Sequence, residues 1–104
     1  MFESIKKAFG LEKPDLTGLI KEGAIILDVR SAREYVSGHI EGSINVPVGE
    51  LEKNLQRFKD KNKTIITCCA SGMRSASAKN FLTSNGYTNV HNGGGWQSLN
   101  QLIK

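Results

Sequence analysis

The segment Thr64-Ile-Ile-Thr-Cys-Cys-Ala-Ser-Gly-Met-Arg-Ser75 predicts a strand that runs through a tight loop into a helix. Its first five residues are β-branched or apolar, which is typical of a strand covered on both faces. The Ala-rich stretch from Ser75 to Ser84 then predicts a helix that stops at an Asn-Gly pair. The loop between strand and helix therefore lies at the carboxyl end of a parallel strand, where open α/β sheets bind ligands.

The rest of the chain alternates between further strands and helices. Other strands are predicted at 24–29, 43–46 and 89–91, and other helices at 16–22, 50–58 and 96–103. A capping box at Ser31 and Glu34 opens one more short helix, which ends near Gly38. We therefore expect an α/β fold with a mostly parallel central sheet of about four to five strands, flanked by helices on both faces.

The length of 104 residues predicts one domain over 1–104, with 1–13 as an N-terminal helix or extension. The first ten residues of the chain, if helical, place Phe2, Ile5 and Phe9 on one face. We interpret this face as packing on its own domain rather than anchoring the chain to a membrane or a partner. No apolar run reaches the roughly 18 residues needed to span a bilayer.

Charge and cysteine content bear on the partners, the cellular location and the redox chemistry that we expect for this protein. The net charge is +4, but ten acidic residues are interleaved with fourteen basic ones, so we expect no nucleic-acid partner. The chain opens without an apolar secretory core, which predicts a cytoplasmic protein. Its two cysteines, Cys68 and Cys69, are neighbours, and adjacent cysteines rarely form a disulfide. A thiol kept for chemistry or packing is the remaining interpretation.

The loop offers two candidate nucleophiles. From Cys69 it forms Cys-x-x-Gly-x-Arg, a six-residue cradle suited to a single sulfur; from Cys68 it forms Cys-x5-Arg, the spacing of cysteine-dependent phosphatases and arsenate reductases. Loop N–H groups and the helix N-terminus favour a thiolate in either case. Glycine lies three positions after the nucleophile in tyrosine phosphatases, and Gly72 has that spacing from Cys69. Cys68, as a small hydrophobic residue at a strand end, is expected to point into the packing.

Three motifs in order make the chain resemble the small single-domain members of the rhodanese-like (thiosulfate sulfurtransferase) family. The first is Asp28-Val-Arg30, with Glu34-Tyr35 and the Gly-His-Ile-Glu-Gly-Ser-Ile-Asn-Val-Pro run of 38–47. The second is the loop of 69–75, and the third is the Gly-Gly-Gly-Trp run of 93–96.

The resemblance implies a sulfurtransferase that moves a sulfane sulfur from a donor such as thiosulfate, through a Cys69 persulfide, to cyanide, a thiol or a protein sulfur acceptor. It implies no metal or organic cofactor. A sulfur-carrier or regulatory partner module with little activity of its own remains an alternative. The resemblance assigns substrate binding to the loop residues that follow the nucleophile: Ala70, Ser71, Gly72, Met73, Arg74 and Ser75.

Supporting roles are expected for three polar residues outside the loop. Asp28 and Arg30 either line the same edge or form a surface ion pair beside a turn. His39 is interpreted as a structural residue that hydrogen-bonds the loop, because thiolate attack on sulfane sulfur needs no base.

Two further expectations concern the loop itself. We expect Arg74 to brace the loop on Asp28 or Glu34 rather than to meet the substrate anion. Small side chains at Ala70 and Ser71 are expected to leave the Cys69 sulfur accessible.

Overall fold

The computed structural model describes residues 15–104, so the predicted N-terminal helix or extension of 1–13 lies outside the described residues. The described helices and strands are α2 (Leu16–Lys21), β1 (Ile25–Asp28), α3 (Ala32–Ser37), β2 (Ile44–Asn45), β3 (Ile65–Cys69), α4 (Met73–Ser84), β4 (Val90–Gly95) and α5 (Trp96–Leu102). Two 3-10 helices, Val48–Glu50 and Glu52–Arg57, lie between β2 and β3. Within this described part, every helix is too short or too polar to cross a membrane.

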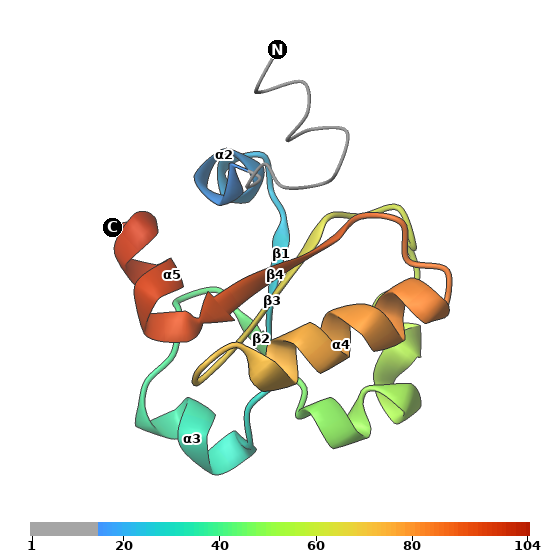
Figure 1. Cartoon of the computed structure of the whole chain (residues 1–104), viewed down its shortest axis with the longest axis horizontal. Helices are drawn as coiled ribbons and strands as arrows, with labels where there is room; N and C mark the ends of the chain where they lie inside the picture. The colour runs from blue at the N-terminus through green and yellow to red at the C-terminus, as the bar shows by residue number, and fades with distance from the viewer. Residues whose placement is uncertain (1–14) are drawn as a thin grey trace.

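The four strands form one parallel sheet in the order β2-β1-β3-β4. This confirms the predicted α/β class and parallel sheet. Figure 1 shows helix α3 and the turn between β3 and α4 at the same end of the sheet. Because all strands point the same way, their carboxyl ends share that edge with the turn.

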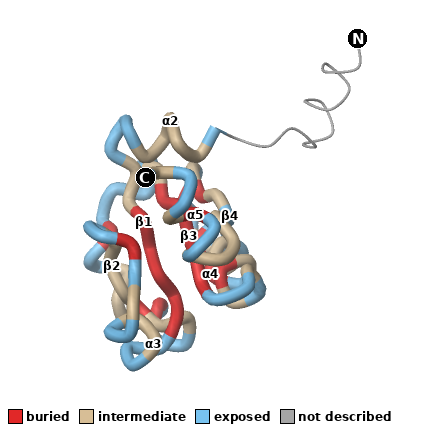
Figure 2. Tube along the Cα trace, turned by 90° about the vertical axis from the view of Figure 1, so that its left-hand side faces the viewer, coloured by how far each residue is buried: buried red, intermediate tan, exposed pale blue. Residues whose placement is uncertain are grey.

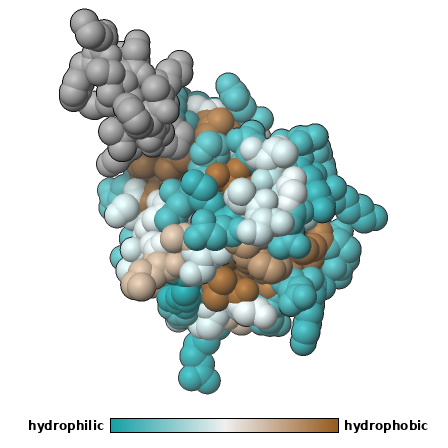
Figure 3. Space-filling view, turned by 45° about the vertical axis from the view of Figure 1, so that its right-hand side comes forward, coloured by the Kyte–Doolittle hydropathy of each residue, from teal (hydrophilic) through white to brown (hydrophobic). Residues whose placement is uncertain are grey.

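Two apolar cores cover the two faces of the sheet. One contains Leu27, Ile65 and Leu82 and lies under α4 and the 3-10 helices; the other contains Ile26, Ile66 and Leu99 and lies under α2 and α5. All five residues of β3 are buried, and Figure 2 shows buried backbone along β1 and β3. On the face seen in Figure 3, most of the described surface is hydrophilic and hydrophobic surface is confined to smaller patches.

Side-chain caps fix the starts of two helices. The Asp15 carboxylate accepts the Gly18 N–H at 3.1 Å at the start of α2. At α3 the Ser31 hydroxyl accepts the Glu34 N–H at 3.2 Å, and the Glu34 carboxylate accepts the Ser31 N–H at 3.1 Å. The predicted capping box is therefore confirmed, and it places Glu34 beside the turn that follows β3.

The structure corrects the predicted helix of 50–58, which is built from two 3-10 segments. Leu51 and Phe58 are buried as the apolar pattern required. However, neither segment has a side-chain N-cap, and Gly49 lowers helix propensity in the first. Short 3-10 turns are frequent in connecting segments of this kind.

The predicted strand of 89–91 is also too short, because β4 continues through the glycines to Gly95. Ideal Cβ atoms placed on two of these glycines show why. A Cβ on Gly93 would lie 2.8 Å from Ile66 Cγ2 and 2.9 Å from the Thr67 carbonyl oxygen, and one on Gly95 would lie 3.0 Å from the Ala70 carbonyl oxygen. Only glycine lets β4 come this close to β3 and to the loop after it.

Candidate active site

The loop after β3 begins at a distortion of the sheet. The pairing of β3 with β4 shifts register between Thr67 and Cys69, and Cys69 pairs with Gly95. Gly72 then caps α4 with a φ of 102°, a left-handed conformation that disfavours any side chain. The shift and the left-handed glycine fold residues 69–75 back, so that loop N–H groups surround the Cys69 side chain.

The Cys69 sulfur lies in a cradle of hydrogen-bond donors. Its Sγ accepts the Gly72 N–H at 3.0 Å and the Ser75 N–H at 3.4 Å, and the Ser75 hydroxyl oxygen lies 3.4 Å away. Burial alone raises the pKa of a thiol, but here hydrogen bonds from Ser75, Gly72 and Ser71 outweigh it. The pKa of Cys69 is therefore lowered, which favours the nucleophilic thiolate.

The sulfur is not accessible in the way that the sequence predicted. Cys69 has 0% exposure, although Ala70 and Ser71 are exposed and Met73 is 79% exposed. The prediction was wrong because Cys69 packs into the core that contains Leu27, Ile65 and Leu82, so small neighbours in the loop do not expose its sulfur.

Cys68 points to the other face of the sheet. Side chains alternate along a strand, so Cys68 packs with Ile66 and Leu99 while Cys69 packs with the opposite core. Cys68 is fully buried, and burial followed by the nearby Asp28 charge raises its pKa to about 12. These surroundings disfavour Cys68 as a nucleophile and argue against the phosphatase spacing.

Arg74 joins the loop to helix α3. Its two terminal nitrogens donate to the two carboxylate oxygens of Glu34 at 2.6 and 3.0 Å. The hydrogen bond from Arg74, followed by the N–H of Ser31, lowers the pKa of Glu34 to about 2. This is the bracing contact that we favoured, with Glu34 rather than Asp28 as the partner. The Arg74 side chain is 38% exposed, so the ion pair forms at the rim of the site.

Asp28 and Arg30 form an ion pair, one of the two arrangements considered, but the pair is buried and does not lie at the surface. Arg30 Nη2 lies 2.7 Å from Asp28 Oδ2, and the two side chains are 5% and 0% exposed. Arg30 also donates to the carbonyl oxygens of Glu34 and Gly38, and its guanidinium lies 4.7 Å from the centre of the Trp96 ring. The sequence offered the ion pair as one of two alternatives and gave no sign of its cover, because Trp96 comes from α5 at the other end of the chain.

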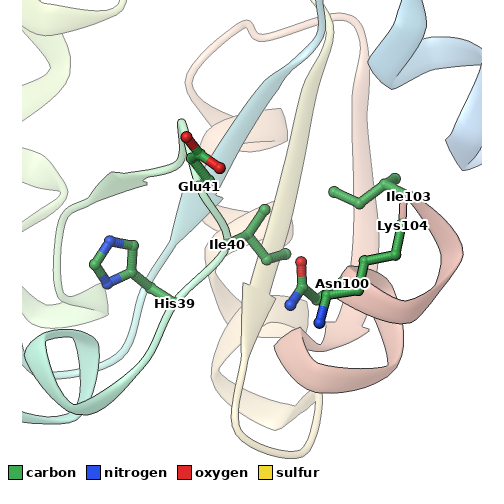
Figure 4. A pocket seen from close by; sticks show the side chains of 6 residues that line it. All are labelled: His39, Ile40, Glu41, Asn100, Ile103 and Lys104. Atoms are coloured by element: carbon green, nitrogen blue, oxygen red, sulfur yellow. The ribbon is translucent and has the colours of Figure 1, made fainter.

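His39 does not take the predicted place against the loop. Its Nδ1 lies 2.7 Å from the Tyr35 carbonyl oxygen, and its ring stacks on Tyr35 with centroids 3.8 Å apart. It borders a separate pocket whose other lining residues are Ile40, Glu41, Asn100, Ile103 and Lys104. Figure 4 shows the His39 ring turned away from Asn100 and Ile103. We therefore interpret His39 as a residue that stabilises the end of α3.

Asn92 is a site residue that the sequence analysis missed. Its side-chain oxygen accepts the Ser75 hydroxyl at 2.6 Å and the Gly94 N–H at 2.9 Å, and its amide nitrogen lies 3.4 Å from the Gly72 carbonyl oxygen. It thus fastens the end of β4 to the loop around Cys69. A polar residue directly before the glycine run, on the strand next to the reactive one, was the available signal.

Thr67 supports the same loop from inside the sheet. Its hydroxyl donates to the Ser75 carbonyl oxygen at 2.8 Å and is fully buried. This contact fixes the first turn of α4 against β3, so the N–H of Ser75 stays aimed at the sulfur. Among residues 15–104, no group of three or more His, Cys, Asp and Glu side chains is arranged to hold a metal ion.

Fold and site together define an α/β protein whose activated cysteine lies in a six-residue loop between a parallel strand and a helix. Residues 12–101 match the family model described as the rhodanese-like domain. The chain belongs to the rhodanese-like family, as its three motifs predicted.

Named relatives agree with this assignment. The chain is 36% identical over 74 residues to thiosulfate sulfurtransferase PspE of Escherichia coli, covering 70% of this chain and 71% of that protein. It is 34% identical over 101 residues to thiosulfate:glutathione sulfurtransferase of Saccharomyces cerevisiae, covering 86% and 67%. The human single-domain sulfurtransferase TSTD1 superposes with a TM-score of 0.73 at 32% identity, covering 88% and 92%. These relatives support sulfur transfer as the general reaction class.

Proposed function

We propose that this protein transfers a sulfane sulfur from a donor such as thiosulfate to a thiol, through a persulfide on Cys69. The observation that carries the proposal is the cradle around Cys69, in which N–H groups of Gly72 and Ser75 aim at the sulfur. Fixed donors of this kind stabilise an anion without the reorganisation that water requires. The names of the sulfurtransferase relatives supply the reaction class.

The reaction has two half-reactions. In the first, the Cys69 thiolate attacks the outer sulfur of thiosulfate; a sulfur–sulfur bond forms to Cys69, and the bond to the central sulfur breaks to release sulfite. In the second, an acceptor thiolate attacks the outer sulfur of the persulfide and leaves as a new persulfide, while the electron pair returns to Cys69 as thiolate. Cyanide serves as an acceptor in the same way and leaves as thiocyanate. Both steps predict ping-pong kinetics.

Roles for the loop follow from its geometry. The backbone of 70–75 is proposed to hold the persulfide charge, with Gly72 and Ser75 as its main donors. Arg74 is proposed to keep the loop closed through Glu34 rather than to bind the donor. A reducing compartment such as the cytoplasm would maintain both cysteines as thiols, and we propose that location for the protein.

Intact-protein mass spectrometry after thiosulfate treatment tests the persulfide. Wild type and Cys68→Ala should each gain one sulfur atom that cyanide removes, whereas Cys69→Ser should gain none. Alanine is the matched control because Cys68 is fully buried and a serine there would bury an unpaired hydroxyl.

Other outcomes separate the alternatives. A gain that survives Cys69→Ser but is lost in Cys68→Ala would refute the assignment of the nucleophile. Loading of Cys69 without turnover to cyanide or small thiols would instead support a sulfur carrier that passes its sulfur to a protein.

A further inference from the structure

The Ser75 hydroxyl has one hydrogen and three neighbours that can take it. Its oxygen lies 2.6 Å from Asn92 Oδ1, 3.0 Å from the Gly72 carbonyl oxygen and 3.4 Å from Cys69 Sγ. A hydroxyl donates only one hydrogen bond, so these three contacts compete. The contact with Asn92 is the shortest, which assigns the hydrogen to the Asn92 oxygen.

The orientation of the Asn92 amide follows from its other contacts. Its oxygen also accepts the Gly94 N–H at 2.9 Å, a contact that an amide nitrogen in the same place could not make. Its nitrogen faces the Gly72 carbonyl oxygen at 3.4 Å. The oxygen therefore points to Ser75 and can only accept there.

The choice of hydrogen position matters for Cys69. While the Ser75 hydrogen points to Asn92, a lone pair of the hydroxyl oxygen faces the sulfur. That lone pair accepts a hydrogen bond from a neutral thiol but repels a thiolate. To stabilise the anion, the Ser75 hydroxyl must rotate away from Asn92 and donate to the sulfur.

We propose that Asn92 is a positioning residue that holds the Ser75 hydroxyl as an acceptor toward Cys69 and so favours the resting thiol over the thiolate. When a charged sulfur forms, the hydroxyl turns to the sulfur and Asn92 keeps the Gly94 N–H as its partner. The switch leaves no buried acceptor unpaired, so its cost is one exchanged hydrogen bond. Asn92 thereby restrains the nucleophile until a donor anion or a persulfide is present.

The charged groups around Cys69 are the same with or without Asn92. Arg74 on α4 contributes a positive charge, and Glu34 on α3 compensates it at 2.6 Å. On β3, the adjacent Cys68 has a pKa raised to about 12 and stays neutral. The segment of β4 from Asn92 to Gly95 carries no charge. A shift caused by Asn92→Ala is therefore attributable to the hydroxyl of Ser75.

The test measures the ultraviolet absorbance of the Cys69 thiolate against pH in a Cys68→Ala background. Asn92→Ala should raise the thiolate fraction about three- to tenfold at a fixed pH below the midpoint. Adding Asn92→Ala to Ser75→Ala should leave the thiolate fraction at its Ser75→Ala value, because no hydroxyl remains to be positioned. Asn54→Ala, which removes an amide that bonds the Glu50 carbonyl oxygen, is the matched control and should leave the titration unchanged.

Two results would overturn the proposal: a lower or unchanged thiolate fraction in Asn92→Ala, or the same shift from Asn92→Ala when Ser75 is absent. Asn92→Gly also removes the acceptor without adding a charge, in a strand that already continues through glycines, and should raise the thiolate fraction as Asn92→Ala does, so the test does not depend on one variant folding. The inference rests on the proposed function only in taking Cys69 as the working thiol. Absorbance needs no sulfur donor, so its failure is distinguishable from a failure to load sulfur.

Discussion

Replacing Asp28 with Asn should destabilise the fold strongly, because it leaves a buried charge unpaired. The Asp28 carboxylate accepts the Arg30 backbone N–H at 3.0 Å, Nε at 3.0 Å and Nη2 at 2.7 Å. Arg30 stays charged in the variant, because a guanidinium does not lose its proton in proteins. Removing one partner of a buried pair costs about 3–5 kcal/mol. Because Arg30 keeps two carbonyl acceptors and the Trp96 ring, we expect Asp28→Asn to cost about 3 kcal/mol.

Urea denaturation measures this loss directly. With a slope of about 1–3 kcal/mol per molar, a loss of about 3 kcal/mol lowers the midpoint by roughly 1–3 M. Combining Asp28→Asn with Arg30→Met should recover part of the loss, because no charge then remains unpaired. Glu34→Gln is the matched control, since it breaks a half-exposed pair and should cost much less. A loss below about 1 kcal/mol in Asp28→Asn, or no recovery in the double variant, would refute the reasoning.

Three further outcomes follow from the same contacts. Gly93→Ala should lower the unfolding free energy by about 1–3 kcal/mol in urea titrations, because its Cβ would crowd Ile66 and Thr67. Gly49→Ala is the control: its Cβ meets nothing within 4 Å, so its unfolding free energy should differ from that of wild type by no more than about 0.5 kcal/mol. The folded state lowers the pKa of Glu34 from 4.5 to about 2. The difference in unfolding free energy between wild type and Glu34→Gln should therefore be constant above pH 4.5 and shrink as the pH falls toward 2. A difference that grows on acidification contradicts the ion pair. Folding also lowers the pKa of Cys69. Urea midpoints of wild type relative to Cys69→Ala should therefore rise as the pH increases through the pKa of Cys69 in the folded state. A fall over that range would show that burial outweighs the loop donors.

Local patterns were enough to predict the elements that place the reactive loop. The apolar run of β3 and the capping box at Ser31 are determined by neighbouring residues, so the sequence alone located them. Gly72, whose left-handed φ of 102° turns the chain from strand to helix, was located by its spacing from Cys69. The spacing of that glycine also separated Cys69 from Cys68, and their opposite packing agrees with it.

Long-range contacts explain what the sequence could not predict. The cover over Arg30 comes from Trp96, and Cys69 packs against core residues from several other elements; neither is visible in the local pattern around the covered residue. Asn92 was missed for the same reason, because its role depends on a hydrogen bond to Ser75 that only the pairing of β3 with β4 creates. The extension of β4 through Gly95 was hidden because glycine is a poor strand former and is used there for close approach.

The opposite directions of Cys68 and Cys69 have a consequence for survival under oxidants. The sheet itself separates the two sulfurs, and Cys68 is held by pairing with Asp28 while Cys69 is held by pairing with Gly95. These are the two cysteines of the chain, so a sulfenic acid formed on Cys69 has no thiol in its own fold to condense with. Repair must come from a thiol in solution, and without one a second oxidation leads to the irreversible sulfinic acid. The working lifetime of the protein in peroxide is therefore set by the thiol pool around it rather than by its own sequence.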